Sequence, residues 1–91
     1  MTPEQVVAVV EKYETELKAL TSPSRISPHS AGPQDGEAIA HALWMCGETK
    51  TYASSGTPDG MEKTCRWLGF IQGVLWMTGL RNIQEMRDEN G

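Results

Sequence analysis

The fold is decided by the stretch TPDGMEKTCRWLGFIQGVLWMTG, residues 57–79. It opens with a helix start, because Thr57 can cap a helix, the following proline suits the first helical position and Asp59 places an acid in the first turn. It closes with Gly79, the residue type most often found just after a last helical turn. The stretch therefore predicts a helix over about residues 58–78.

The second half of this helix is apolar on nearly every side. From Cys65 to Met77, only Arg66 and Gln72 interrupt the run. A helix that is apolar all round lies either at the centre of a fold or at the centre of an assembly.

Two glycines, Gly69 and Gly73, stand four residues apart and so share one side of the helix. Each destabilises a helix interior by about 1 kcal/mol relative to alanine. Small residues in a row let a second helix backbone approach closely. Two interpretations stay open: either the first or second helix of the same chain lies in that groove, or another subunit does.

The large apolar side chains exceed what three short helices usually hide. They are Trp44, Met45, Met61, Trp67, Phe70, Trp76, Met77 and Met86. An exposed apolar patch indicates a partner or self-association, and Trp and Met are enriched at interfaces. We therefore expect a homo-oligomer or a protein target, with an interface formed by Trp44, Trp67, Gly69, Phe70, Gly73, Trp76 and Met77.

Three further helices flank this one. Residues 3–20 begin with a capping box and carry the apolar seam Val6, Val10, Tyr13, Leu17 and Leu20. A second helix covers about 35–53, and a short last helix covers 83–89 after a capping box, with Ile83, Met86 and Leu80 expected to face inward. The predicted fold is all-α: one domain over 1–91, a small antiparallel bundle of three main helices and a short C-terminal helix.

A Ser/Pro-rich loop over residues 21–34 interrupts the helical pattern. It is long for a connection in so small a domain, and long loops are either functional or mobile. As a flexible tether it needs no contacts. As a recognition element it would use Arg25, Ser27 and His29.

Composition narrows the classes of function. With 91 residues and 38% apolar content, the chain suits one packed domain and excludes two-domain enzymes. The net charge is −4 with no cluster of Lys or Arg, so we expect no nucleic-acid partner. No membrane span or signal peptide is evident, so we expect a cytosolic protein.

No set of residues has the spacing that chemistry requires. His29, His41, Cys46 and Cys65 are the candidate ligands or nucleophiles, yet they form neither a CxxC nor an HxxxH motif. Both cysteines fall in apolar helical patterns and are expected to be buried and unpaired. We therefore expect no metal, no cofactor and no catalytic activity.

The string Trp-Leu-Gly-Phe-Ile-Gln-Gly at 67–73, together with the stretch Leu43 to Cys46, resembles a set of small, mostly uncharacterised proteins of tailed phages and prophages. The resemblance implies an accessory protein in the host bacterial cytoplasm that binds and inhibits a host or anti-phage defence protein. It implies no catalytic residues. The alternative function is sequestration of a small signalling nucleotide between subunits, with Arg25, His29 and Arg66 as phosphate partners.

Overall fold

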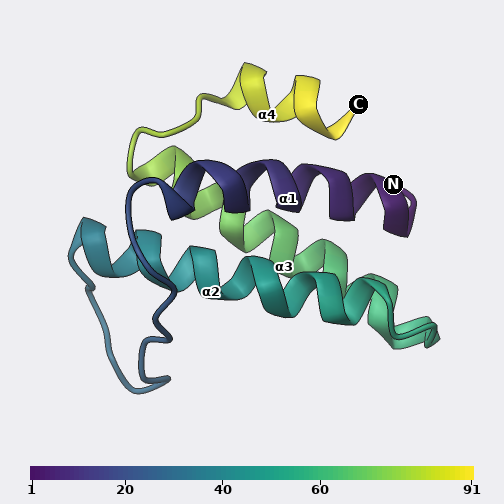
Figure 1. Ribbon diagram of the computed structural model, residues 1–91, viewed down its shortest axis with the longest axis horizontal. Helices are drawn as coiled ribbons and strands as arrows, with labels where there is room; N and C mark the ends of the chain where they lie inside the picture. The colour runs from purple at the N-terminus through teal and green to yellow at the C-terminus, as the bar shows by residue number, and fades with distance from the viewer.

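The computed structural model describes all 91 residues and contains four helices and no strand. The helices are α1 (Pro3–Lys18), α2 (Asp35–Ala53), α3 (Pro58–Met77) and α4 (Ile83–Asn90). Successive helices run in opposite directions, so both chain ends lie at the same end of the molecule (Figure 1). The predicted all-α bundle of three main helices and a short fourth is confirmed.

The arrangement of the helices leaves one side of α3 uncovered. α1 and α2 lie side by side, α3 packs behind them, and α4 lies along α1 on the side away from α2 (Figure 1). The long connection between α1 and α2 folds back over the first half of α2. No helix covers the face of α3 that points away from α1 and α2.

The predicted helix starts are confirmed in detail. The Thr2 hydroxyl accepts a hydrogen bond from the Gln5 amide at 3.2 Å, and the Gln5 side chain accepts one from the Thr2 amide at 2.7 Å. The Thr57 hydroxyl accepts from the Gly60 amide at 3.0 Å. These bonds satisfy amides that a helix cannot pair internally, and each typically stabilises a helix by about 1 kcal/mol.

The core lies where α1, α2 and α3 meet. Its fully buried members come from all three helices: Val6, Val10, Tyr13 and Leu17 on α1, Ala42, Leu43 and Cys46 on α2, and Leu68, Ile71 and Leu75 on α3. The seam predicted for α1 is therefore confirmed except at its end. Leu20 lies beyond the helix and is 61% exposed, because α1 stops at Lys18.

Several side chains differ from their predicted positions. Cys65 is exposed rather than buried, since it projects from the uncovered face of α3. Ile83 is 50% exposed rather than inward-facing, because α4 touches the bundle along one edge only. Gln72, which interrupts the apolar run in the sequence, is buried in the bundle.

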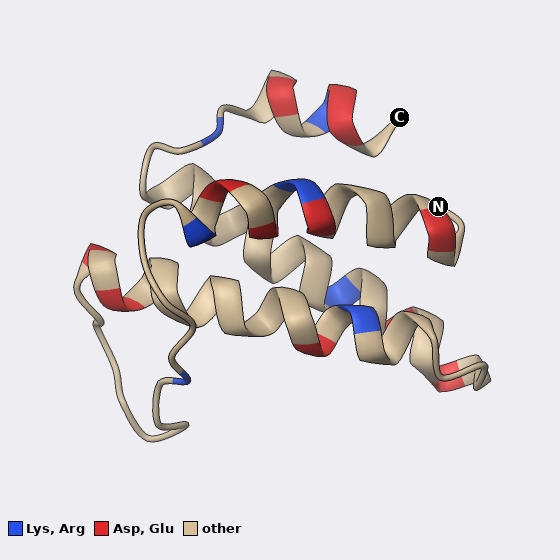
Figure 2. Cartoon of the chain, viewed as in Figure 1, with Lys and Arg blue, Asp and Glu red and all other residues tan.

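A polar junction holds α4 to the bundle. The Tyr13 hydroxyl donates to Glu89 Oε1 at 2.8 Å, and Arg81 and Lys12 form ion pairs with the same carboxylate. The Gln72 amide donates to the Tyr13 hydroxyl at 3.1 Å. Figure 2 shows charged residues of both signs on α1 and α4. No residue of α4 is fully buried, so polar contacts rather than apolar burial position this helix.

Candidate protein-binding surface

The outer face of α3 exposes large apolar side chains. Phe70, Trp76 and Met77 are 56%, 50% and 74% exposed. They lie on the opposite side of the helix from the buried Leu68, Ile71 and Leu75, so the helix buries one face and leaves an apolar face in water. The expectation that the core cannot hide every large apolar residue is confirmed at these three positions. We call this uncovered side of the helix, which also carries the exposed residues Glu62, Cys65, Arg66, Gly69 and Gly73, the outer face of α3.

An open groove of about 520 Å³ lies at the C-terminal half of this face. The first turns of α2 and the residues before it form its other wall. The lining residues are Pro33, Asp35, Ala38, Phe70, Gly73, Val74, Trp76, Met77 and Thr78. Asp35 is the only ionisable side chain among them. The groove is therefore an apolar recess with one negative charge at its edge.

The glycines of α3 do not support a contact within the chain. A Cβ atom added to Gly69 or Gly73 would meet no atom within 4 Å. The interpretation that another helix of the same chain packs against these glycines is therefore wrong, because α1 and α2 both pack on the opposite side of α3. At Gly73, the missing side chain instead forms part of the groove.

A row of aromatic rings runs along the seam between α2 and α3. His41, Trp44 and Tyr52 come from α2, and Trp67 comes from α3; we call these four residues the aromatic ridge. The ring centroids of His41 and Trp44 lie 5.4 Å apart, those of Trp44 and Trp67 5.9 Å, and those of Trp67 and Tyr52 5.0 Å. Tilted and edge-on pairs at such separations stabilise by about 0.5–1.5 kcal/mol each.

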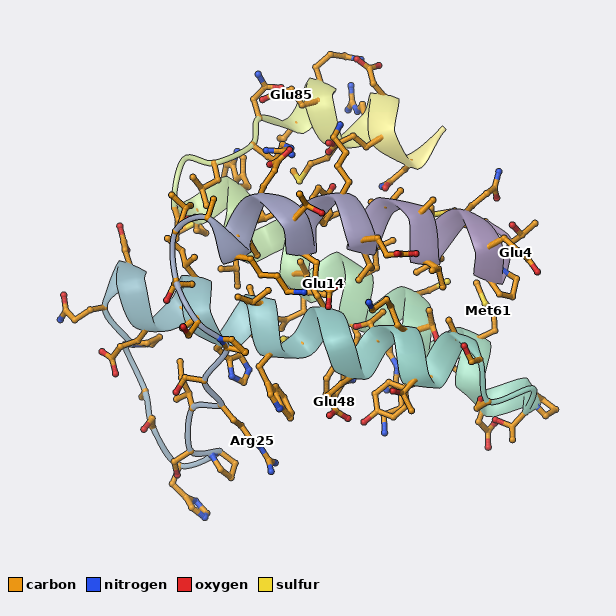
Figure 3. All side chains as sticks on the ribbon, viewed as in Figure 1. Glu4, Glu14, Arg25, Glu48, Met61 and Glu85 are labelled. Carbon is orange, nitrogen blue, oxygen red and sulfur yellow. The ribbon has the colours of Figure 1, made fainter.

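Cationic side chains cover the aromatic ridge at two points. The Arg25 guanidinium lies 5.2 Å from the Trp44 ring, and the Lys63 ammonium lies 4.1 Å from the Tyr52 ring. Figure 3 shows Arg25 extending from the loop beside the aromatic side chains of α2. These cation–π contacts tie the loop and α3 to the ridge.

The loop over residues 21–34 is attached to α2 by its backbone. The Ser24 amide donates to the Ala40 carbonyl at 3.1 Å, and the Ile26 amide donates to Nδ1 of His41 at 3.0 Å. Burial and, second, the positive charge of Arg25 lower the pKa of His41. The neutral imidazole that accepts the Ile26 amide is thereby favoured.

The three predicted phosphate partners do not share a cavity. Arg25 lies beside a polar recess between the loop and α2 that also contains Glu37. His29 is exposed in the middle of the loop, and Arg66 is exposed on α3 without an ion pair. Within one chain these residues form no common anion site.

The candidate nucleophiles and metal ligands, like the phosphate partners, lie apart from one another. Burial and, second, the nearby charge of Glu14 raise the pKa of Cys46 to about 12, so its thiol stays protonated and unreactive. Cys65 is a free thiol on the outer face of α3. No group of three His, Cys, Asp or Glu side chains is placed to hold a metal ion.

Sequence reasoning missed the second wall of the groove. Pro33, Asp35 and Ala38 line it, although the sequence marks position 35 only as the start of the second predicted helix. No spacing or motif links these positions to Trp76, because they lie about forty residues earlier and meet it only after the bundle forms.

The class that the fold and surface define is a small α-helical bundle with an uncovered apolar helix face. No family model matches the chain, and neither the curated proteins nor the solved structures contain a significant match. None of the helices is both long enough and apolar enough to cross a lipid bilayer.

Proposed function

We propose that this protein is a non-catalytic binding protein that engages other proteins through the outer face of α3 and the aromatic ridge. Following the resemblance in residues 67–73, we propose a phage accessory protein that inhibits a bacterial host or anti-phage defence protein in the host cytoplasm. The observation that carries the binding proposal is the exposure of Phe70, Trp76 and Met77 around one groove.

The physical basis is the free energy gained when these side chains leave water. Apolar surface contributes about 25 cal/mol for each Å² buried, and aromatic anchors that fill pockets dominate protein interfaces. Phe70, Trp76 and Met77 are large side chains that are half or more exposed, and they lie next to a recess that can accept a partner side chain. Single exposed apolar residues are ordinary, but a contiguous patch marks an interaction site.

The chemistry of the groove supports binding rather than catalysis. Its one ionisable side chain, Asp35, has no second titratable group beside it in the lining. The Thr78 hydroxyl donates to the Val74 carbonyl at 2.8 Å and thus completes the end of α3. General acid–base or nucleophilic catalysis needs a paired donor and acceptor at the reacting atom, which this lining does not offer.

The test compares a double variant of the outer face with a control variant at an exposed apolar residue elsewhere. Phe70→Ser with Trp76→Ser removes the two aromatic anchors of the outer face, while Ile83→Ser removes an equally exposed apolar residue on α4. Each protein is produced in bacteria that carry a defence system, and phage plaque formation is counted. We expect wild type and Ile83→Ser to protect the phage and the double variant to fail. Equal protection by all three proteins would contradict the proposal.

Mass spectrometry of the purified protein, native and then denatured, tests the alternative function. A nucleotide that leaves only on denaturation would support the sequestering protein. That function has less support, because Arg25, His29 and Arg66 lie apart in one chain and would need a second subunit to meet.

A further inference from the structure

The outer face of α3 changes character along its length. Its N-terminal half carries Cys65 and Arg66, while its C-terminal half carries Phe70, Trp76 and Met77. Arg66 is exposed and has no acidic partner in the chain. The acidic edge of the groove, Asp35, likewise has no ion pair. The face therefore has the unpaired Arg66 at one end, with the exposed Glu62 one turn further from the groove, and at the other end an apolar recess edged by the unpaired Asp35.

Such a face is complementary to a second copy of itself that runs in the opposite direction. An antiparallel copy of α3 places the end that carries Arg66 against the end that carries the groove, twice by symmetry. A parallel copy would instead place Arg66 against Arg66 and Trp76 against Trp76, which brings like charges together and leaves both grooves empty. Charge and shape both favour the antiparallel arrangement.

The positions of the exposed residues around α3 are compatible with the antiparallel arrangement. Phe70, Gly73, Met77 and Arg66 project toward the same flank of the outer face, the flank beside the first turns of α2, where Asp35 lies. A two-fold axis midway between residues 71 and 72 sets Phe70 of one chain over Gly73 of the other, where no Cβ occupies the space. The same axis sets Arg66 beside Met77, within side-chain reach of Asp35.

We infer that the groove is filled by a second copy of this chain, in an antiparallel α3–α3 dimer in which Phe70 packs on Gly73 and Arg66 pairs with Asp35 of the other subunit. The inference rests on the proposed use of the outer face of α3 as a protein contact. With a second copy of the chain in the groove, the aromatic ridge is the proposed surface that remains for the host protein. The inference also explains Gly73, an exposed glycine in the middle of a helix that no contact within the chain requires.

Charge reversal with mixing tests the Arg66–Asp35 pair directly. Asp35→Arg and Arg66→Glu each create two repulsive pairs in a homodimer, whereas a mixture of the two variants creates attractive pairs at both sites. Sedimentation equilibrium should give a wild-type mass of two chains at micromolar concentration. Each variant alone should dissociate at least about tenfold more readily, and the mixture should recover most of the affinity. Circular dichroism confirms that each exposed substitution leaves the helices intact.

Two results would overturn the inference. One is a wild-type protein that sediments as a single chain even at about 100 times the micromolar concentration of the first measurement. The other is a mixture of the two variants that associates no better than either variant alone. Neither depends on a host target, so both can be distinguished from failure of the plaque assay. If wild type stays a single chain while the Phe70 and Trp76 variant loses phage protection, the groove binds another protein and only the dimer is excluded.

Oxidation of the wild-type protein tests the direction of the helices. In the antiparallel dimer the two Cys65 residues lie about 20 Å apart along the helices, since each is about six and a half residues from the axis. A disulfide needs Cα atoms within about 7 Å, so no cross-linked dimer should appear on a non-reducing gel. Efficient Cys65–Cys65 cross-linking would overturn the antiparallel arrangement.

Discussion

At the scale of single residues, Glu89 is the centre of the junction that holds α4. Burial acts to raise the pKa of Glu89, but hydrogen bonds from Lys12, Tyr13 and Arg81 outweigh it and lower that pKa. Burial also raises the pKa of Tyr13 to about 12, which keeps its hydroxyl protonated as the donor to Glu89. The carboxylate is therefore stabilised in its charged form by partners on α1 and on the segment before α4.

We predict that Glu89→Gln lowers the free energy of unfolding by about 1.5–3 kcal/mol at pH 7, because hydrogen bonds to a charged group are lost. A lowered folded-state pKa contributes stability above the unfolded pKa of about 4.3, and this contribution is lost as the pH falls through the folded value. The gap between wild type and variant should therefore close below about pH 4. Urea unfolding across this range measures it, with Asp88→Asn, an exposed neighbour, as the control. A gap that stays the same from pH 6 down to pH 2 would contradict the ionic origin.

A second prediction concerns His41, whose neutral Nδ1 accepts the Ile26 amide. Because the folded-state pKa is lowered, docking of the loop is strongest above the unfolded pKa of about 6.5 and weakens as the pH falls through the folded value. Arg25 is the charged group that faces the ring, beside Trp44 and Phe70. The protection factor of the Ile26 amide against hydrogen exchange should fall as His41 titrates. A constant protection factor from pH 7 to 4 would show that His41 does not hold the loop.

At the scale of elements, the two faces of α3 differ in packing and in helix propensity. Its inner face packs against α1 and α2, and its outer face carries glycines that weaken the isolated helix. Gly60, near its start, differs from the two outer glycines, because a Cβ there would clash with Ser55 Oγ and lie 3.1 Å from the Tyr52 carbonyl oxygen. One glycine of α3 is thus required by the chain itself, whereas Gly69 and Gly73 are not.

We predict that Gly69→Ala and Gly73→Ala each raise the unfolding free energy of the dissociated chain by about 1 kcal/mol, since alanine is the better helix former and meets no atom. Gly73→Ala should also weaken association, because the new methyl group occupies the place of the partner's Phe70. Denaturant melts at low protein concentration measure the first effect and sedimentation the second. The control Gly60→Ala should destabilise by about 1–3 kcal/mol through overpacking. Destabilisation of the dissociated chain by Gly69→Ala would contradict the open environment seen for this residue.

At the scale of the whole molecule, residues 21–34 connect α1 to α2 and pack against α2. The loop adds backbone hydrogen bonds to Ala40 and His41 and brings Arg25 over Trp44. The bundle itself is held by the core of α1, α2 and α3, together with the ion pair between Glu14 and Lys50, whose side-chain atoms lie 2.6 Å apart between α1 and α2 (Figure 3). The loop is therefore docked on a bundle whose core it does not form.

Replacement of residues 22–32 by a Gly/Ser linker of equal length should keep the helical content and lower the unfolding free energy by about 1–3 kcal/mol. The loss comes from the greater freedom of the unfolded linker and from the missing cation–π contact. Circular dichroism and a thermal melt measure both quantities, and Arg25→Ala should reproduce a part of about 0.5–1 kcal/mol. Loss of cooperative unfolding would show that Ile26, which is half-buried, belongs to the core.

The sequence by itself determined the helices and most of the core. Start signals such as Thr2 with Gln5 are local, because the capping residue and the amide it pairs lie within one turn. The seam on α1 is likewise readable, because the helical period alone decides which residues share a face. The apolar outer face of α3 was also predictable, since its large side chains exceed what a core of this size can hold.

Only the tertiary structure decided how those faces are used. Gln72 reads as a polar interruption, yet it is buried because Tyr13 and Asn90, far away in sequence, provide its hydrogen-bond partners. From the sequence, Gly69 and Gly73 could contact either a helix of the same chain or another subunit. The packing decides this, because α1 and α2 lie on the opposite side of α3. Asp35 lines the groove because the packing of α2 on α3 places it beside residues that are far away in the sequence. A local pattern specifies a face, but the contacts that this face makes depend on chain segments that meet only after folding.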